Sequence, residues 1–181
     1  MENGMLSGLP DFPPSLIYED GSELRLCPLA KTRGKPLYCS ADARFFSYTL
    51  RKNKTTKRFE RVLRQVKPWK TTHAPSRKSG GWQNYLKVGA GGYYCHILMA
   101  WAWLGPQPFD KNGHKYQCHH LNGIPTDNRA SNLIWLSPAD HRRFDAALKQ
   151  GLILTRVDPG TSSRRNGKSG LRLEGSHHME F

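Results

Sequence analysis

The chain has 181 residues, of which 28 are Lys or Arg and 14 are Asp or Glu, so its formal net charge is +14. A field of this sign attracts polyanions, and it favours nucleic acid as a partner because phosphate neutralisation supplies most non-specific affinity. No apolar run approaches the roughly 18 residues of a membrane span, and Pro and Gly interrupt the basic stretches, so we expect no membrane partner.

The cysteines and the first residues bear on the cellular compartment. The four cysteines form no CxxC pair, and residues 1–14 lack the basic-then-apolar order of a signal peptide. We therefore expect reduced thiols in a cytoplasmic protein.

Composition predicts a loop-rich α+β fold. Hydrophobic residues make up 37% of the chain, mean hydropathy is −0.68, and there are 17 Gly and 12 Pro. We expect residues 1–36 to be an N-terminal extension with short strands, such as one at residues 24–26. Residues 37–48 have the composition of strand and turn.

Residues 37–92 form a basic region. Between residues 44 and 87 there are 13 Lys or Arg and one acidic residue, Glu60, with aromatic residues interleaved. Such a stretch is either a solvated face over a small core or a surface that contacts phosphates and bases, and the charge bias favours the second. The predicted DNA-binding residues here are Arg51, Lys52, Lys54, Lys57, Arg58, Arg61 and Arg64.

The middle of the chain predicts strands at residues 85–88 and 93–95, joined by a Gly-rich turn. Residues 96–104 are apolar and compatible with a helix, which Gly105 and Pro106 should end. His96 lies between an apolar strand and an apolar helix, so we interpret it as structural.

Residues 114–150 predict a strand, a loop, a second strand and a helix. An extended segment and turn at residues 114–122 are followed by a short strand at Leu133–Leu136. Ser137 is a suitable N-cap, Pro138 suits the first helical position and Asp140 suits the first turn, so a helix should run to about residue 149 and stop at Gly151. Residues 151–181 are rich in Gly, Ser and Arg, and we expect a flexible basic tail.

Three histidines in this segment suit phosphodiester hydrolysis, which needs a base to activate water and a cation to stabilise the developing charge. His119 and His120 are neighbours on a predicted strand, where successive side chains point to opposite faces, so one could face a metal and the other the water. His141 follows 21 residues after His120, inside the predicted helix. The paired histidines alone favour a structural role in which they bond the loop backbone, but the ordered set favours a nuclease site.

The segment resembles the HNH endonuclease motif in the form found in phage homing endonucleases. The resemblance covers about residues 93–148 well and residues 37–92 weakly, and residues 96–104 are similar to a helix that precedes the motif in the family. It implies a small ββα-metal nuclease domain at residues 93–150, in a bacterial or phage-infected cell. The motif residues are His119, His120, Leu121, Asn122, Gly123, Asp127, Asn128, Arg129, Asn132, Leu133 and His141.

The resemblance also implies roles for individual residues. His120 would be the general base, His119 and His141 would be metal ligands, and Asn132 would hold the loop and orient His120. Asp145 lies one helical turn beyond His141 and could reach the same ion.

The expected cofactor is one divalent ion, Mg²⁺ or Mn²⁺. Two imidazoles suit Mg²⁺ less well than carboxylates do, so Zn²⁺ or Ni²⁺ also fit. Near the site, Arg129, Arg142 and Arg143 are candidate DNA contacts.

These observations predict a metal-dependent endonuclease that acts on double-stranded DNA, with phage homing as one fitting role. The alternative is a non-catalytic DNA-binding protein with a decayed site, or with a structural zinc held by Cys118, His119 and His141.

Overall fold

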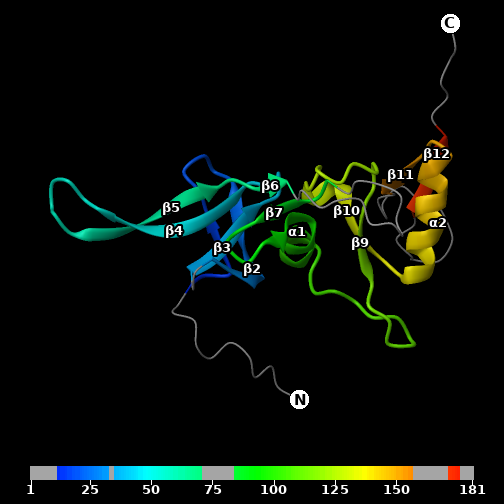
Figure 1. Cartoon of the computed structure of the whole chain (residues 1–181), viewed down its shortest axis with the longest axis horizontal. Helices are drawn as coiled ribbons and strands as arrows, with labels where there is room; N and C mark the ends of the chain where they lie inside the picture. The colour runs from blue at the N-terminus through cyan, green and yellow to red at the C-terminus, as the bar shows by residue number, and fades with distance from the viewer. Residues whose placement is uncertain (1–11, 33–34, 71–83, 157–170, 176–181) are drawn as a thin grey trace, which may run out of the picture.

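A five-stranded antiparallel sheet forms the N-terminal half of the molecule (Figure 1). The computed structural model describes residues 12–32, 35–70, 84–156 and 171–175. The sheet has the order β1-β2-β3-β4-β5. Its strands are β1 (Ser15–Ile17), β2 (Glu23–Thr32), β3 (Lys35–Ser40), β4 (Phe45–Lys52) and β5 (Phe59–Val66).

The alternation of side chains along β3 and β4 gives the sheet a core on each face. Tyr38 and Phe46 pack with Leu24 on one face, while Leu37 and Phe45 point into the larger core on the other. The boundary that we expected after residue 36 falls inside β3, and β2, from the expected N-terminal extension, pairs with β3 in one sheet. Short-range composition does not reveal this pairing.

The larger core joins this sheet to the middle of the chain. Helix α1 (Cys95–Trp103) buries Cys95, Leu98 and Met99 completely or nearly so, and these residues pack with Val88 and Leu133. The strands β6 (Trp69–Lys70), β7 (Leu86–Val88) and β8 (Tyr93–Tyr94) form a small antiparallel sheet beside it.

The expected helix at residues 96–104 is confirmed, except that Cys95 already belongs to it and the preceding strand is shorter. Gly105 follows with φ +93°, a conformation that glycine adopts without strain.

The predicted strand, loop, strand and helix are confirmed. β9 (Gln117–His120) pairs antiparallel with β10 (Leu133–Leu136), a short 3₁₀ helix (Ala130–Asn132) precedes β10, and α2 (Pro138–Lys149) follows it. The Ser137 hydroxyl accepts a hydrogen bond from the Asp140 backbone N–H at 3.1 Å and donates to the Asp140 carboxylate at 2.8 Å. This reciprocal cap fixes where α2 begins.

The segment that we expected to be a flexible basic tail contains two strands among its described residues. β11 (Leu152–Arg156) pairs antiparallel with β12 (Leu171–Gly175). A polar, Gly-rich composition did not indicate this pairing, because it depends on main-chain hydrogen bonds between segments distant in sequence. Residues 157–170 and 176–181 of the expected tail lie outside the described residues.

Among the described residues, none of the helices has the length and apolar character needed to cross a membrane.

The four cysteines are free, and burial should make them unreactive. Burial raises the pKa of Cys95 and of Cys118 to about 12, and a hydrogen bond with Cys39, together with burial, holds the pKa of Cys27 well above its ordinary value. These thiols therefore stay protonated at pH 8, where a thiolate is needed for reaction.

We predict that a disulfide reagent at pH 8 modifies the native thiols slowly and all four thiols rapidly after unfolding in urea. The measurement is absorbance of the released chromophore with time. Rapid reaction of several thiols in the native protein would contradict the packing described here.

Candidate metal and catalytic site

Two neighbouring histidines on β9 face opposite sides of the β9–β10 ribbon. His119 is opposite Ile134 and His120 is opposite Leu133 in the antiparallel register. Both are buried, with 5% and 7% of their surface exposed. His119 contacts α2, whereas the ring of His120 lies near His96, so the two imidazoles have different surroundings.

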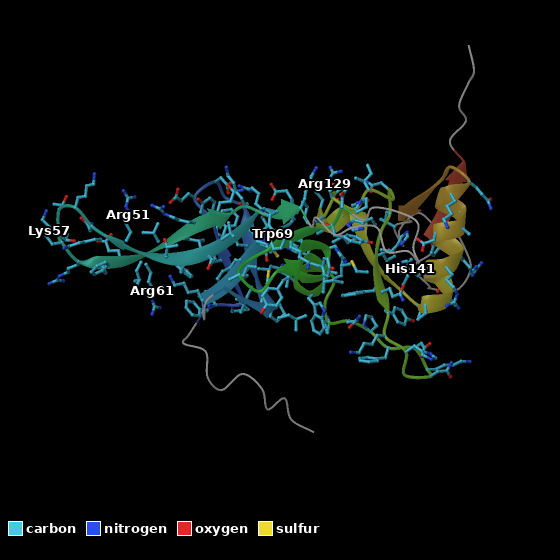
Figure 2. The ribbon with its side chains drawn as sticks, viewed as in Figure 1. Arg51, Lys57, Arg61, Trp69, Arg129 and His141 are labelled. Carbon is cyan, nitrogen blue, oxygen red and sulfur yellow. The ribbon has the colours of Figure 1, made fainter. Side chains whose placement is uncertain are left out.

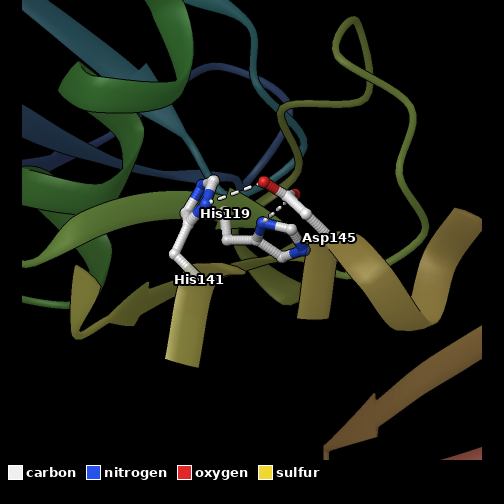
Figure 3. Close-up of side chains that lie close together, drawn as sticks. All are labelled: His119, His141 and Asp145. Carbon is white, nitrogen blue, oxygen red and sulfur yellow. Dashed lines mark ion pairs between the residues drawn. The ribbon is translucent and has the colours of Figure 1, made fainter. Parts of the chain in front are cut away.

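On the α2 side, three side chains converge (Figure 3). His141 and Asp145 are one helical turn apart, and His141 Nδ1 lies 3.0 Å from Asp145 Oδ2. His119 Nδ1 lies 3.7 Å from Asp145 Oδ1, and the rings of His119 and His141 are 4.8 Å apart at 85°. One donor atom from each residue lies within 4.8 Å of the others, so a strand and a helix distant in sequence form one cluster.

Burial keeps His119 in the form that binds a cation. Its pKa is lowered to about 4, chiefly by burial and further by the neighbouring His141, so the ring is neutral at pH 7. Its Nε2 is buried and has no hydrogen-bond partner among the described residues. An unpaired buried nitrogen is costly unless a ligand completes the site.

The donor set fits one divalent ion. Two ligands at about 2.1 Å from an ion can be at most about 4.2 Å apart, so donors within 4.8 Å of one another need a small side-chain shift to bind one ion together. Two imidazole nitrogens and one carboxylate oxygen suit Mn²⁺, Zn²⁺ or Ni²⁺ better than Mg²⁺. The side chain of Asp145 is 48% exposed, so the cluster has an open side, as catalytic sites with three protein ligands do.

Cys118 is not part of this cluster. Its thiol donates to the backbone carbonyl of His96 at 3.6 Å, and its side chain packs against the larger core. The structure therefore does not assemble the alternative ligand set of Cys118, His119 and His141.

On the other face of β9, His120 is held by Asn128. The amide of Asn128 donates through Nδ2 to the carbonyl of Thr126 at 3.4 Å, which directs Oδ1 toward His120 Nε2 at 2.9 Å. In this arrangement His120 donates its Nε2–H, so the lone pair is on Nδ1. Burial lowers the pKa of His120, and the hydrogen bond to Asn128 opposes that shift, so the ring is a neutral base at pH 7.

Two further rings pack behind His120. The ring centroid of His96 is 5.4 Å from that of His120, and the ring of Tyr85 is 6.2 Å away and nearly parallel. His96 is itself neutral, since burial lowers its pKa to about 3. This placement agrees with our interpretation of His96 as a structural residue. From α1, its ring packs against the imidazole of His120.

Asn132 stabilises the loop between β9 and β10. Its Oδ1 accepts from the Asn122 backbone N–H at 3.1 Å, and its Nδ2 donates to Asn122 Oδ1 at 2.9 Å and to the Asp127 carbonyl at 2.8 Å. Asn122 in turn donates to the Asp127 carboxylate at 2.8 Å. Asn132 thus bonds the loop, whereas the side chain that contacts His120 directly is Asn128.

Asn128 is among the motif residues, but the sequence alone assigned it no role. The signal for a role is its place in the Asp-Asn-Arg triplet, in which Arg129 pairs with Asp127 at 2.7 Å and Asn128 Oδ1 contacts His120. This pair lowers the pKa of Asp127 to about 2.

The predicted basic residues divide into two groups. Arg129 is near the β9–β10 loop, and the exposed Arg142 and Arg143 are on α2. The β4–β5 hairpin and α2 lie at opposite ends of the molecule (Figure 2). The structure therefore does not bring the hairpin residues to the histidine cluster. The group on the hairpin is Arg51, Lys52, Lys54, Lys57, Arg58, Arg61 and Arg64.

Comparison with known proteins identifies the segment that contains the cluster. Residues 93–143 match the family model described as HNH endonuclease. No curated protein and no solved structure matches the chain. The matched segment runs from β8 into α2 and includes His119, His120, Asn132 and His141, so its resemblance to the HNH endonuclease family is confirmed. Asp145 lies just beyond it.

Because Asn132 is buried and bonds three groups, Asn132→Ala should lower the free energy of unfolding by about 1–3 kcal/mol. The measurement is urea unfolding followed by tryptophan fluorescence. The matched control is Asn112→Ala, at an exposed turn where the backbone N–H bonds Asp110. Equal effects of the two substitutions would show that Asn132 does not hold the loop.

Proposed function

We propose that this protein is a metal-dependent DNA endonuclease that hydrolyses phosphodiester bonds. The observation that carries the proposal is the convergence of His119, His141 and Asp145 next to a neutral, oriented His120. The three histidines lie in the segment that matches the HNH endonuclease family, and Asp145 follows two residues after its end. The four residues provide a cation site and a base on one short strand and one helix.

His119, His141 and Asp145 would hold one divalent ion. When bound, the ion would stabilise the negative charge that develops on the phosphate and on the leaving oxygen. The neutral state of His119 and the exposed side of Asp145 support this assignment, because the first leaves a lone pair and the second leaves room for a phosphate.

His120 would act as the general base. Nδ1 takes a proton from a water molecule, and the water oxygen then attacks phosphorus while the bond to the leaving sugar oxygen breaks. Asn128 keeps Nε2 as the donor, so the charge gained by the ring is stabilised at 2.9 Å by the Asn128 carbonyl oxygen. His96 and Tyr85 restrict the ring to this orientation.

The basic surface supports double-stranded DNA as the substrate. Exposed Lys and Arg side chains lie on the β4–β5 hairpin and on α2, where phosphates can reach them. Arg142 and Arg143 are on α2 with His141 and Asp145, and they would contact DNA phosphates next to the cleaved bond. Arg129, in the β9–β10 loop, would also contact phosphates near the site. The resemblance to the phage-type motif favours a role in homing, and the free cysteines favour the cytoplasm.

The first test is cleavage of supercoiled plasmid. We predict nicked or linear product with Mn²⁺, or with Mg²⁺ at higher concentration, because the donor set contains two imidazoles. The reaction should stop in EDTA and resume when excess Mn²⁺ is added. Cutting that persists in EDTA would reject the metal mechanism, and intact plasmid under all metals would reject the nuclease.

The second test separates the base from the metal ligands. His120→Ala should lower the single-turnover rate by about 10²–10⁴-fold and leave DNA affinity unchanged, because the base does not hold DNA. His141→Ala should also stop cleavage, but by weakening metal binding, so high Mn²⁺ should restore part of the rate.

The same manganese titration should not rescue His120→Ala, since added metal cannot replace a base. Lys149→Ala, in the last turn of α2, is the control for non-specific effects on the helix, because its side chain is exposed and is assigned neither to the ion nor to DNA. Wild-type cleavage by His120→Ala would remove the base assignment.

A further inference from the structure

The β4–β5 hairpin extends beyond the sheet that it belongs to (Figure 1). β3 pairs with β4 at residues 45–47, whereas β4 and β5 continue to pair with each other as far as Lys52 and Phe59. We call residues 48–63 the arm. Each of its strands adds five residues beyond the sheet, or about 17 Å at the usual rise.

The arm is strongly basic and has a well-defined turn. Six of its residues are Lys or Arg and one, Glu60, is acidic. At the turn, the side chain of Asn53 accepts from the backbone N–H groups of Thr55 and Thr56 and donates to Glu60 at 2.7 Å. The basic residues, all exposed, are Arg51, Lys52, Lys54, Lys57, Arg58 and Arg61.

The strand register divides the arm into two unlike faces. Leu50 is opposite Arg61 and Lys52 is opposite Phe59, so these four residues share one face. The other face contains Arg51 opposite Glu60 and, next to them, Thr49 opposite Val62. Arg51 and Arg61 accordingly lie on opposite sides of the ribbon in Figure 2.

The face with Leu50, Lys52, Phe59 and Arg61 combines cations with exposed apolar groups and contains no acid. Leu50 is 61% exposed and Phe59 is 69% exposed. The guanidinium of Arg61 lies 5.7 Å from the ring of Phe12, which orients it at the base of the arm. A surface that only touches phosphates needs charge, whereas apolar groups next to cations suit base edges and the thymine methyl group.

We propose that the arm enters the major groove of double-stranded DNA and presents this face to the base edges, which would make it the part of the protein that recognises sequence. The major groove, about 12 Å wide, admits a two-stranded ribbon without deformation, whereas the minor groove, about 6 Å wide, has to be widened by bending the DNA. This proposal rests on the proposed function, in which DNA is the substrate. It adds which groove the arm enters, which face of the arm contacts the bases, and that this contact lies far from the histidine cluster.

The decisive probe is a duplex whose major groove is blocked. We would compare a 30-base-pair mixed-sequence duplex with the same duplex carrying bulky substituents at C5 of its thymine positions, which fill the major groove and leave the minor groove unchanged. Affinity of the full-length protein is measured by fluorescence anisotropy in EDTA. The modified duplex should bind about tenfold more weakly; equal affinity, or tighter binding to the single strand, would overturn the proposal.

Variants assign the contact to one face. Lys52→Ala combined with Arg61→Ala, and separately Leu50→Ser combined with Phe59→Ser, should each lower affinity for the plain duplex by about tenfold and abolish the discrimination against the modified duplex. Arg51→Ala is the matched control on the opposite face. It should weaken binding only through lost charge and keep the discrimination.

Discrimination that survives in both double variants would reject this face. Because binding is measured without metal, the result does not depend on cleavage. A protein that does not cleave DNA could still discriminate between the plain and the modified duplex. Conversely, intact cleavage together with equal binding to the two duplexes would reject the arm and leave the nuclease proposal standing.

Discussion

The antiparallel pairing of β9 with β10 is the constraint on which the site depends. Because neighbouring residues of a strand point to opposite faces, this pairing directs His119 toward α2 and His120 toward α1 and the β9–β10 loop. One strand thus carries the proposed metal ligand and the proposed base at adjacent positions. A shift of the β9–β10 register by one residue would turn each histidine to the opposite face of the ribbon, so that neither would reach its present partners.

The partners on the two sides differ in kind. On the α2 side, the Ser137–Asp140 cap sets where the helix begins, and so sets the positions of His141 and Asp145 relative to His119. On the other side, Asn132 closes the loop, and the loop brings Asn128 to His120. Burial acts on both histidines in the same direction, keeping each neutral, which suits a ligand and a base alike.

Much of the site was predictable from sequence because its signals are local. The cap at Ser137, the strand at Leu133–Leu136 and the spacing between His120 and His141 are properties of short segments. The partner of His120 was not predictable in this way, since Asn128 and Asn132 are both polar loop residues and only the loop conformation shows which of them reaches the ring.

The larger architecture was harder to predict. The basic residues between 44 and 66 were recognised as a charged stretch, but composition does not show that they extend on a hairpin whose two faces differ. The sheet that crosses the expected boundary at residue 36 and the pairing of β11 with β12 depend on contacts distant in sequence, which local patterns do not contain.

The central claim is that His119, His141 and Asp145 hold a catalytic ion, and the direct measurement is a crystal soaked in MnCl₂ with anomalous diffraction collected near the manganese edge. The account predicts one strong anomalous peak within about 2.0–2.3 Å of a nitrogen of each histidine and an oxygen of Asp145. A strong peak elsewhere, or none between β9 and α2 at saturating manganese, would contradict it.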